Sequence, residues 1–121
     1  MLKTIAFAAG LAIGSVTAAF AGPGDIGGHY TVAGTNADGS AYNGTADITV
    51  TSKNTCRITW DTGSTADGIC MRNGIAFAAA YALGKDIGLI IYEIKPDGVL
   101  DGIWTLADKE GVGTEVLTPG Q

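Results

Sequence analysis

The sequence is poor in positive charge and in long apolar runs. Seven lysines and arginines face twelve aspartates and glutamates, which gives a formal net charge of −5. An acidic balance of this kind argues against nucleic acid and anionic membrane surfaces as partners. No stretch after residue 21 is long and apolar enough to span a bilayer as a helix. We therefore expect no nucleic-acid binding and no membrane insertion of the mature chain.

Motifs for catalysis and for metal binding are also missing. The chain has no G-x-S-x-G turn, and its only histidine, His29, stands in no recognisable setting for a catalytic triad. The segment Asp61–Gly68 loosely matches a calcium loop but lacks the ligand spacing and the closing glutamate. We predict a protein without enzymatic activity, cofactor or metal. A pair of acids converging in a cleft is the enzymatic alternative.

The N-terminus has the pattern of a secretion signal. A basic start at Lys3 precedes a short apolar segment and the sequence Ala19-Phe20-Ala21, an A-x-A cleavage site. We predict a signal peptide over residues 1–21 and a single mature domain over residues 22–121, exported to the periplasm or secreted. A membrane anchor or an N-terminal core helix is the alternative. Of the 121 residues, removing 21 leaves 100, enough for one hydrophobic core.

The two cysteines, Cys56 and Cys70, lie symmetrically about Gly63 in the exported part. A hairpin turning at residues 61–65 would place them opposite each other on antiparallel strands, and an oxidising compartment would keep them paired. A disulfide closing a loop of this length stabilises a fold by about 3 kcal/mol. A redox role is the alternative, although the spacing is not Cys-x-x-Cys.

Glycine is abundant, with 19 residues, and Gly, Asp and Asn clusters separate short β-favouring runs. Asx-Gly pairs at Asp38-Gly39, Asn73-Gly74 and Asp97-Gly98 are typical of tight hairpin turns. The pattern predicts eight strands, at His29–Thr35, Ser40–Val50, Thr55–Trp60, Gly68–Arg72, Ile75–Ala82, Gly88–Ile94, Leu100–Thr105 and Gly113–Leu117.

Consecutive hairpins predict an all-β antiparallel up-and-down meander. Closure would remove the exposed strand edges, so we expect a closed barrel of the lipocalin or avidin kind. A two-sheet β-sandwich is the alternative. The alanine-rich segment Gly74–Leu83 has helical propensity, but the turns that flank it favour a strand.

Aromatic side chains are few, and they are the candidates for contact with a ligand or partner. We select Tyr30, Tyr42, Trp60 and Trp104 for that role, with packing in the core as the alternative for each. In so small a barrel most inward side chains must pack against each other. Room would remain for at most a small ligand near one mouth.

Five segments together carry a family resemblance: Gly28–Gly44, Thr55–Trp60, Gly68–Gly74, Tyr92–Gly98 and Gly113–Leu117. With these segments the chain resembles a family of small exported alphaproteobacterial proteins commonly labelled fibronectin-binding protein. The resemblance covers essentially the whole mature chain. It implies a module that binds an extracellular matrix protein such as fibronectin. The alternative function is a periplasmic small-ligand carrier or inhibitor that uses the barrel mouth.

Binding of a protein partner can use two physical routes. Addition of a partner strand at a sheet edge is the first. A fully closed barrel would forbid strand addition, and contacts from loop aromatics would then have to serve.

Overall fold

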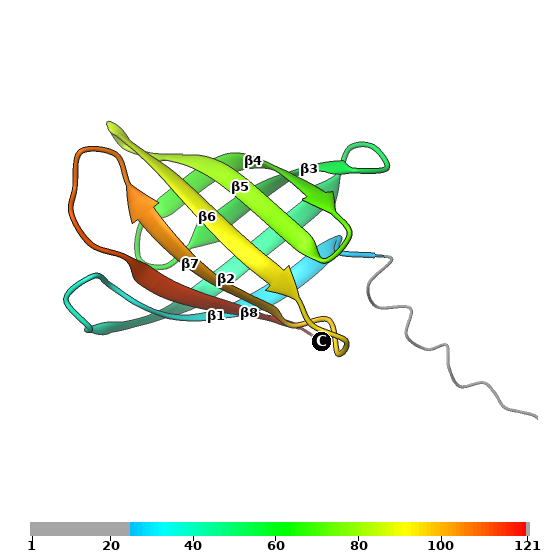
Figure 1. Ribbon diagram of the computed structural model, residues 1–121, viewed down its shortest axis with the longest axis horizontal. Helices are drawn as coiled ribbons and strands as arrows, with labels where there is room; N and C mark the ends of the chain where they lie inside the picture. Colours follow the sequence, from blue (N-terminus) through cyan, green and yellow to red (C-terminus); the bar gives the residue numbers. More distant parts are fainter. Residues whose placement is uncertain (1–24, 121) are drawn as a thin grey trace, which may run out of the picture.

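The computed structural model describes residues 25–120, and the predicted signal peptide over residues 1–21 lies outside them. Eight antiparallel strands follow one another in order around a closed barrel (Figure 1). They are β1 Gly28–Thr35, β2 Ala41–Val50, β3 Thr55–Asp61, β4 Thr65–Asn73, β5 Ala76–Leu83, β6 Asp86–Ile94, β7 Leu100–Leu106 and β8 Gly113–Pro119. The predicted closed up-and-down barrel is confirmed.

Barrel closure comes from the pairing of the first and last strands. Residues of β1 from Tyr30 to Thr35 pair with residues of β8 from Thr114 to Pro119. Each strand therefore has a hydrogen-bonded neighbour on both sides, and the sandwich alternative is excluded. The segment with helical propensity forms β5. Within residues 25–120 no helix is long and apolar enough to cross a membrane.

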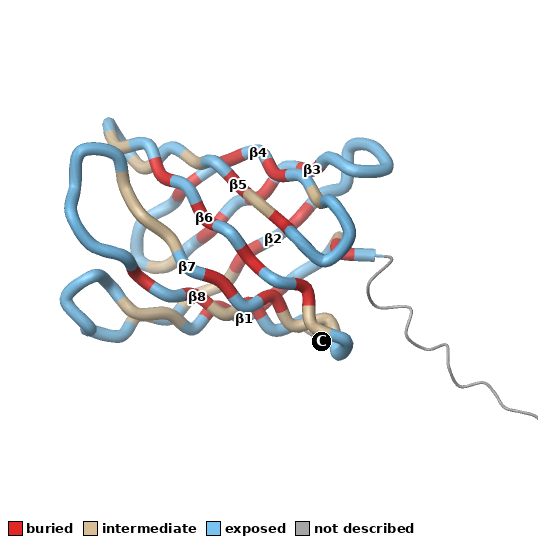
Figure 2. The backbone as a smooth tube through the Cα atoms, in the orientation of Figure 1, coloured by how far each residue is buried: buried red, intermediate tan, exposed pale blue. Residues whose placement is uncertain are grey.

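The strands alternate inward and outward side chains, because successive residues of a strand point to opposite faces of the sheet. Figure 2 shows this alternation as short buried segments between exposed ones. The buried apolar core consists of Ile26, Tyr30, Val32, Ala46, Ile48, Cys56, Ile58, Trp60, Ala66, Cys70, Phe77, Ala79, Ile90, Tyr92, Ile94, Leu100 and Leu117.

The predicted disulfide is confirmed. Cys56 of β3 and Cys70 of β4 are direct partners in the antiparallel register, with their Cα atoms 4.9 Å apart, and they are bonded through sulfur. Both are buried in the barrel interior. The hairpin between these strands turns at residues 62–64, and Gly63 adopts a φ of 98°, a conformation that glycine accepts without strain.

The two ends of the barrel differ. At one end, the interior is filled by fully buried side chains that include Phe77, Leu100 and Leu117. The Tyr30 hydroxyl also donates there to the carbonyl of Ile26, over 2.7 Å. We call this the packed end. The opposite end, which carries the connections 36–40, 62–64, 84–85 and 107–112, we call the mouth; it lies at the left in Figure 1.

Candidate functional site

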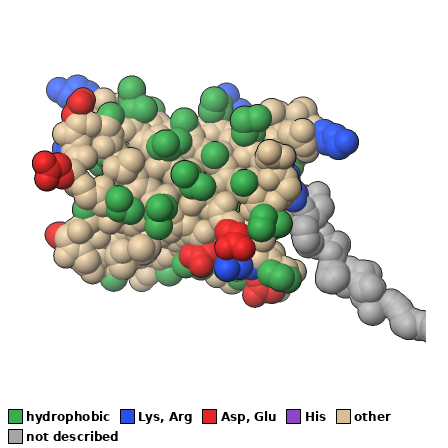
Figure 3. Space-filling model, viewed as in Figure 1, with side chains coloured by type: hydrophobic (Ala, Val, Ile, Leu, Met, Phe, Trp, Pro, Cys, Tyr) green, Lys and Arg blue, Asp and Glu red, His purple; other side chains and the backbone are tan. Residues whose placement is uncertain are grey.

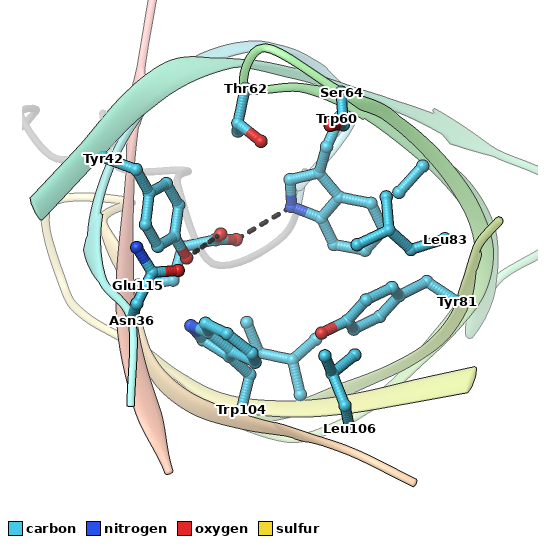
Figure 4. Close-up of a pocket in the computed structure, with 12 residues that line it drawn as sticks. Asn36, Tyr42, Trp60, Thr62, Ser64, Tyr81, Leu83, Trp104, Leu106 and Glu115 are labelled. Carbon is cyan, nitrogen blue, oxygen red and sulfur yellow. Dashed lines mark hydrogen bonds between the residues drawn. The ribbon is translucent and has the colours of Figure 1, made fainter. Parts of the chain in front are cut away.

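A cavity of about 310 Å³ opens at the mouth of the barrel. Figure 4 shows side chains from strands on all sides of the barrel pointing into it. Twelve residues line the cavity: Asn36, Tyr42, Trp60, Thr62, Ser64, Ala66, Tyr81, Leu83, Ile90, Trp104, Leu106 and Glu115. This volume lies at the small end of the range of ligand pockets.

Aromatic rings form two facing walls of the cavity. Trp60 and Tyr81 have ring centroids 5.0 Å apart, and Tyr42 and Trp104 meet edge to face with centroids 6.3 Å apart. Tilted and edge-to-face arrangements suit the quadrupoles of the rings, so within each pair the two rings stabilise each other's position. The walls are thus held in place without a ligand.

Glycines on neighbouring strands give these rings their space. A Cβ added at Gly88 would come under 3.0 Å from the ring of Tyr81, and one at Gly113 would meet the indole of Trp104. A Cβ added at Gly34 would likewise clash with the ring of Tyr42. Each ring lies over the bare backbone of the adjacent strand, which lets large side chains share a narrow barrel. Part of the high glycine content therefore serves the cavity.

Glu115 lies in the wall of the cavity and is only 4% exposed. Its Oε1 accepts a hydrogen bond from the Tyr42 hydroxyl at 2.8 Å, and its Oε2 accepts from the Trp60 indole Nε1 at 2.8 Å. The hydroxyl of Tyr92, beneath the cavity, also donates to Oε2. All three partners donate, which suits an ionised carboxylate, because that group only accepts.

The neighbouring phenols respond to this carboxylate. Burial, followed by the charge of Glu115, raises the pKa of Tyr81 to about 12. The same two causes raise the pKa of Tyr42 and of Tyr92 well above the ordinary value. Both hydroxyls therefore keep their protons at neutral pH and remain donors to Glu115.

The structure brings three of the four selected aromatic residues together. Tyr42, Trp60 and Trp104 all line the cavity. Tyr30 lies towards the packed end instead, where its ring is buried and its hydroxyl binds the backbone at Ile26. The selection did not include Glu115. Its place in the strand, between inward Gly113 and inward Leu117 at two-residue spacing, is the sequence signal that could have identified it.

Other groups considered for chemistry lie away from the cavity. His29 is exposed, and its Nδ1 is 2.8 Å from the carboxylate of Asp47 on the outer surface. Among the residues that line the cavity, Glu115 is the single acid, so the cavity does not supply the carboxylate pair that the enzymatic alternative needs. Within residues 25–120, no three His, Cys, Asp or Glu side chains are grouped to hold a metal ion.

Comparison with known proteins adds no family. The chain matches no protein-family model and no curated protein. The resemblance to fibronectin-binding proteins therefore stays a prediction, and the functional argument depends on the geometry of the site.

Proposed function

We propose that this protein is an exported, non-enzymatic carrier that binds a small molecule in the mouth of its barrel. The observation that carries the proposal is the 310 Å³ cavity walled by Trp60, Trp104, Tyr42 and Tyr81. A carrier requires a hollow, which in proteins is lined mainly by apolar and aromatic side chains, whereas an interior packed to both ends would leave no room for a ligand. The disulfide supports export, because such bonds persist in oxidising compartments.

The composition of the cavity suits a compact, partly apolar ligand. Its walls are largely aromatic and aliphatic, and its few polar groups are concentrated at Glu115, Asn36 and the short turn with Thr62 and Ser64. Apolar walls contribute binding free energy through burial, while a small number of fixed polar groups orients the ligand. The rest of the interior is filled by side chains, which limits the ligand to the mouth.

A library screen tests this proposal. Native mass spectrometry with a few hundred small metabolites should yield compounds that bind at a ratio of one per chain. Trp104→Ala removes one indole from the cavity wall and should weaken the binding of these compounds at least about tenfold, since a large contact surface is lost. Ile103→Ala is the matched control, because Ile103 is the next residue of β7 and is 54% exposed on the outer wall. If no compound binds, or if both variants weaken binding equally, the carrier function is wrong.

A second candidate function, binding of an extracellular protein, is favoured by the outer surface. Figure 3 shows apolar side chains spread over the face of the barrel that is in view. The strand register places Met71, Ala78, Ile91 and Ile103 side by side in one row across β4 to β7, and Ile69, Ala80 and Leu89 in the next. We call these seven residues the apolar face.

Exposure of the apolar face is high. The five side chains larger than alanine are all exposed, from 49% for Leu89 to 62% for Ile69. Contiguous exposed apolar surface is characteristic of protein contact sites. Strand addition is not available to the partner, because all eight strands are already paired on both sides. We propose this face, rather than loop aromatics, as the docking site for a matrix protein such as fibronectin, the partner implied by the family resemblance.

Surface plasmon resonance with immobilised fibronectin tests the second candidate. Saturable binding should be lost in Leu89→Lys, because a buried lysine in the contact would be unpaired. Thr59→Lys, which adds the same charge at an exposed position of β3, should leave binding unchanged. Absence of saturable binding by the unmodified protein removes this candidate.

A further inference from the structure

The cavity contains the carboxylate of Glu115, and no positive side chain within residues 25–120 forms an ion pair with it. Within residues 25–120 the ion pairs are His29 with Asp47 and Lys95 with Glu93, and neither includes Glu115. No lysine, arginine or histidine occurs among the twelve lining residues. A buried carboxylate without a cation is costly even when it is hydrogen-bonded, because neutral donors offset only part of its desolvation.

The hydrogen bonds of Glu115 leave one acceptor position open. A carboxylate offers about four lone-pair positions. Oε2 accepts from both Trp60 and Tyr92, whereas Oε1 accepts from Tyr42 alone. The oxygen with spare capacity is thus the one towards Tyr42, which is itself a wall of the cavity (Figure 4). A hydrogen-bond donor on a ligand could therefore bind to Oε1 of Glu115.

The aromatic walls also attract positive charge. The faces of tryptophan and tyrosine rings carry partial negative charge, and a cation within about 6 Å of a ring centre is stabilised by about 0.5–2 kcal/mol. Four such rings, from Tyr42, Trp60, Tyr81 and Trp104, surround the same small volume as Glu115. The Tyr42 hydroxyl and the Trp60 indole N–H donate to Glu115, and the Trp104 indole N–H donates to the carbonyl of Thr114, so these three donors already have acceptors within the protein.

The rim of the mouth also carries net negative charge. The connections and adjoining strand ends there carry five acids and two lysines: Asp38, Asp61, Asp86, Asp108, Glu110, Lys85 and Lys109. An excess of negative charge around an opening raises the local concentration of small cations and disfavours anions. The acidic rim, the aromatic rings and Glu115 therefore all favour a positively charged ligand.

We infer that the ligand of the mouth cavity is a small organic cation, an amine or quaternary ammonium with an apolar body, whose positive charge lies against Glu115 and the surrounding rings. This inference rests on the proposed carrier function and adds the charge of the ligand. The apolar body would occupy the side of the cavity lined by Leu83, Ile90 and Leu106.

Glu115→Gln removes the charge with little change of shape. The glutamine carbonyl can accept from Trp60 and Tyr92, as Oε2 does. Its amide then faces Tyr42, whose hydroxyl can accept that N–H and donate instead to the backbone carbonyl of Thr114, 3.3 Å away. The variant should fold. Glu93→Gln is the matched control, because it makes the same chemical change on a side chain that is 55% exposed.

The probes are choline and benzyltrimethylammonium, compared with neutral neohexyl alcohol, in which carbon replaces the quaternary nitrogen of choline, and with anionic benzoate. Isothermal titration of the unmodified protein should show saturable binding of at least one cation. Neohexyl alcohol should bind at least about tenfold more weakly than choline, and benzoate at least about tenfold more weakly than benzyltrimethylammonium, which shares its phenyl ring. Glu115→Gln should reduce the preference for the cation to within about threefold, and Glu93→Gln should preserve it.

The outcomes separate the ligand class from the carrier function. If neutral compounds from the library bind in the cavity and neither cation does, or if choline and neohexyl alcohol bind equally, the carrier function stands and the cationic ligand is wrong. If nothing in the library or the probe set binds, both are wrong. If Glu115→Gln does not fold, the comparison of choline with neohexyl alcohol on the unmodified protein still decides the question.

Discussion

Removal of the Glu115 side chain should destabilise the barrel strongly. Glu115→Ala leaves the indole NH of Trp60 and the hydroxyl of Tyr92 without an acceptor, and these residues are 6% and 2% exposed. An unsatisfied buried donor costs about 1–3 kcal/mol, so the loss should be about 2–6 kcal/mol. Tyr42 contributes little to that sum, because its hydroxyl can turn to the carbonyl of Thr114. A domain of this size is stable by about 5–15 kcal/mol, so this loss is a substantial part of the free energy of unfolding.

Urea unfolding followed by far-ultraviolet circular dichroism measures this loss. For a slope of about 2 kcal/mol per molar urea, the midpoint should fall by about 1–3 M. Glu115→Gln should lose less than half as much, since its carbonyl keeps both buried donors paired. Glu93→Ala, which removes an exposed glutamate, should change stability by less than about 1 kcal/mol. A loss below about 1 kcal/mol in Glu115→Ala would mean that water from the cavity satisfies both donors, and the reasoning would be refuted.

Three further changes test other parts of the structure. Cys56→Ala with Cys70→Ala should lower the free energy of unfolding by about 3 kcal/mol, because it releases a loop whose ends are 14 residues apart; an unchanged urea midpoint would contradict this. Gly88→Ala should push the ring of Tyr81 into the cavity and weaken ligand binding in titration calorimetry, and equal affinity would show that the ring yields elsewhere. Stability should also fall as pH rises from about 10 to 12: an unfolded tyrosine ionises near its ordinary pKa, whereas burial and the charge of Glu115 raise the pKa of Tyr81 to about 12, so the unfolded state holds fewer protons in that window. A urea midpoint that does not fall between about pH 10 and 12 would refute this pH dependence.

Most of the fold could be predicted from local sequence. Asx-Gly pairs supply the conformations that tight turns need, and alternating runs between them specify strands, so seven of the eight predicted strands begin within two residues of the observed ones. The exception is β4, which begins at Thr65 rather than Gly68 because pairing with β3 continues to Asp61, next to the turn. The buried Ala66 extends the inward pattern there, and a lone alanine is a weak signal.

The site could be predicted only in part. Trp60 and Trp104 are conspicuous as large aromatic residues in strands, but which inward residues meet at one end of a barrel depends on the stagger of strands across closure, which no local pattern shows. Tyr30 illustrates this, since it is inward-facing like Tyr42 yet lies towards the other end. Glu115 was missed because an acid in a strand ordinarily faces solvent. Its three donors come from β2, β3 and β6, far away in sequence.

The last described residue, Gly120, and the start of β1 lie side by side at the packed end, where the amide of Gly120 donates to the carbonyl of His29 over 2.7 Å. An affinity tag, a fluorophore or a bead attached next to the start of β1 or next to Gly120 would therefore sit on the far side of the barrel from the cavity. The protein is suited to immobilisation as a sensor with its opening towards solution.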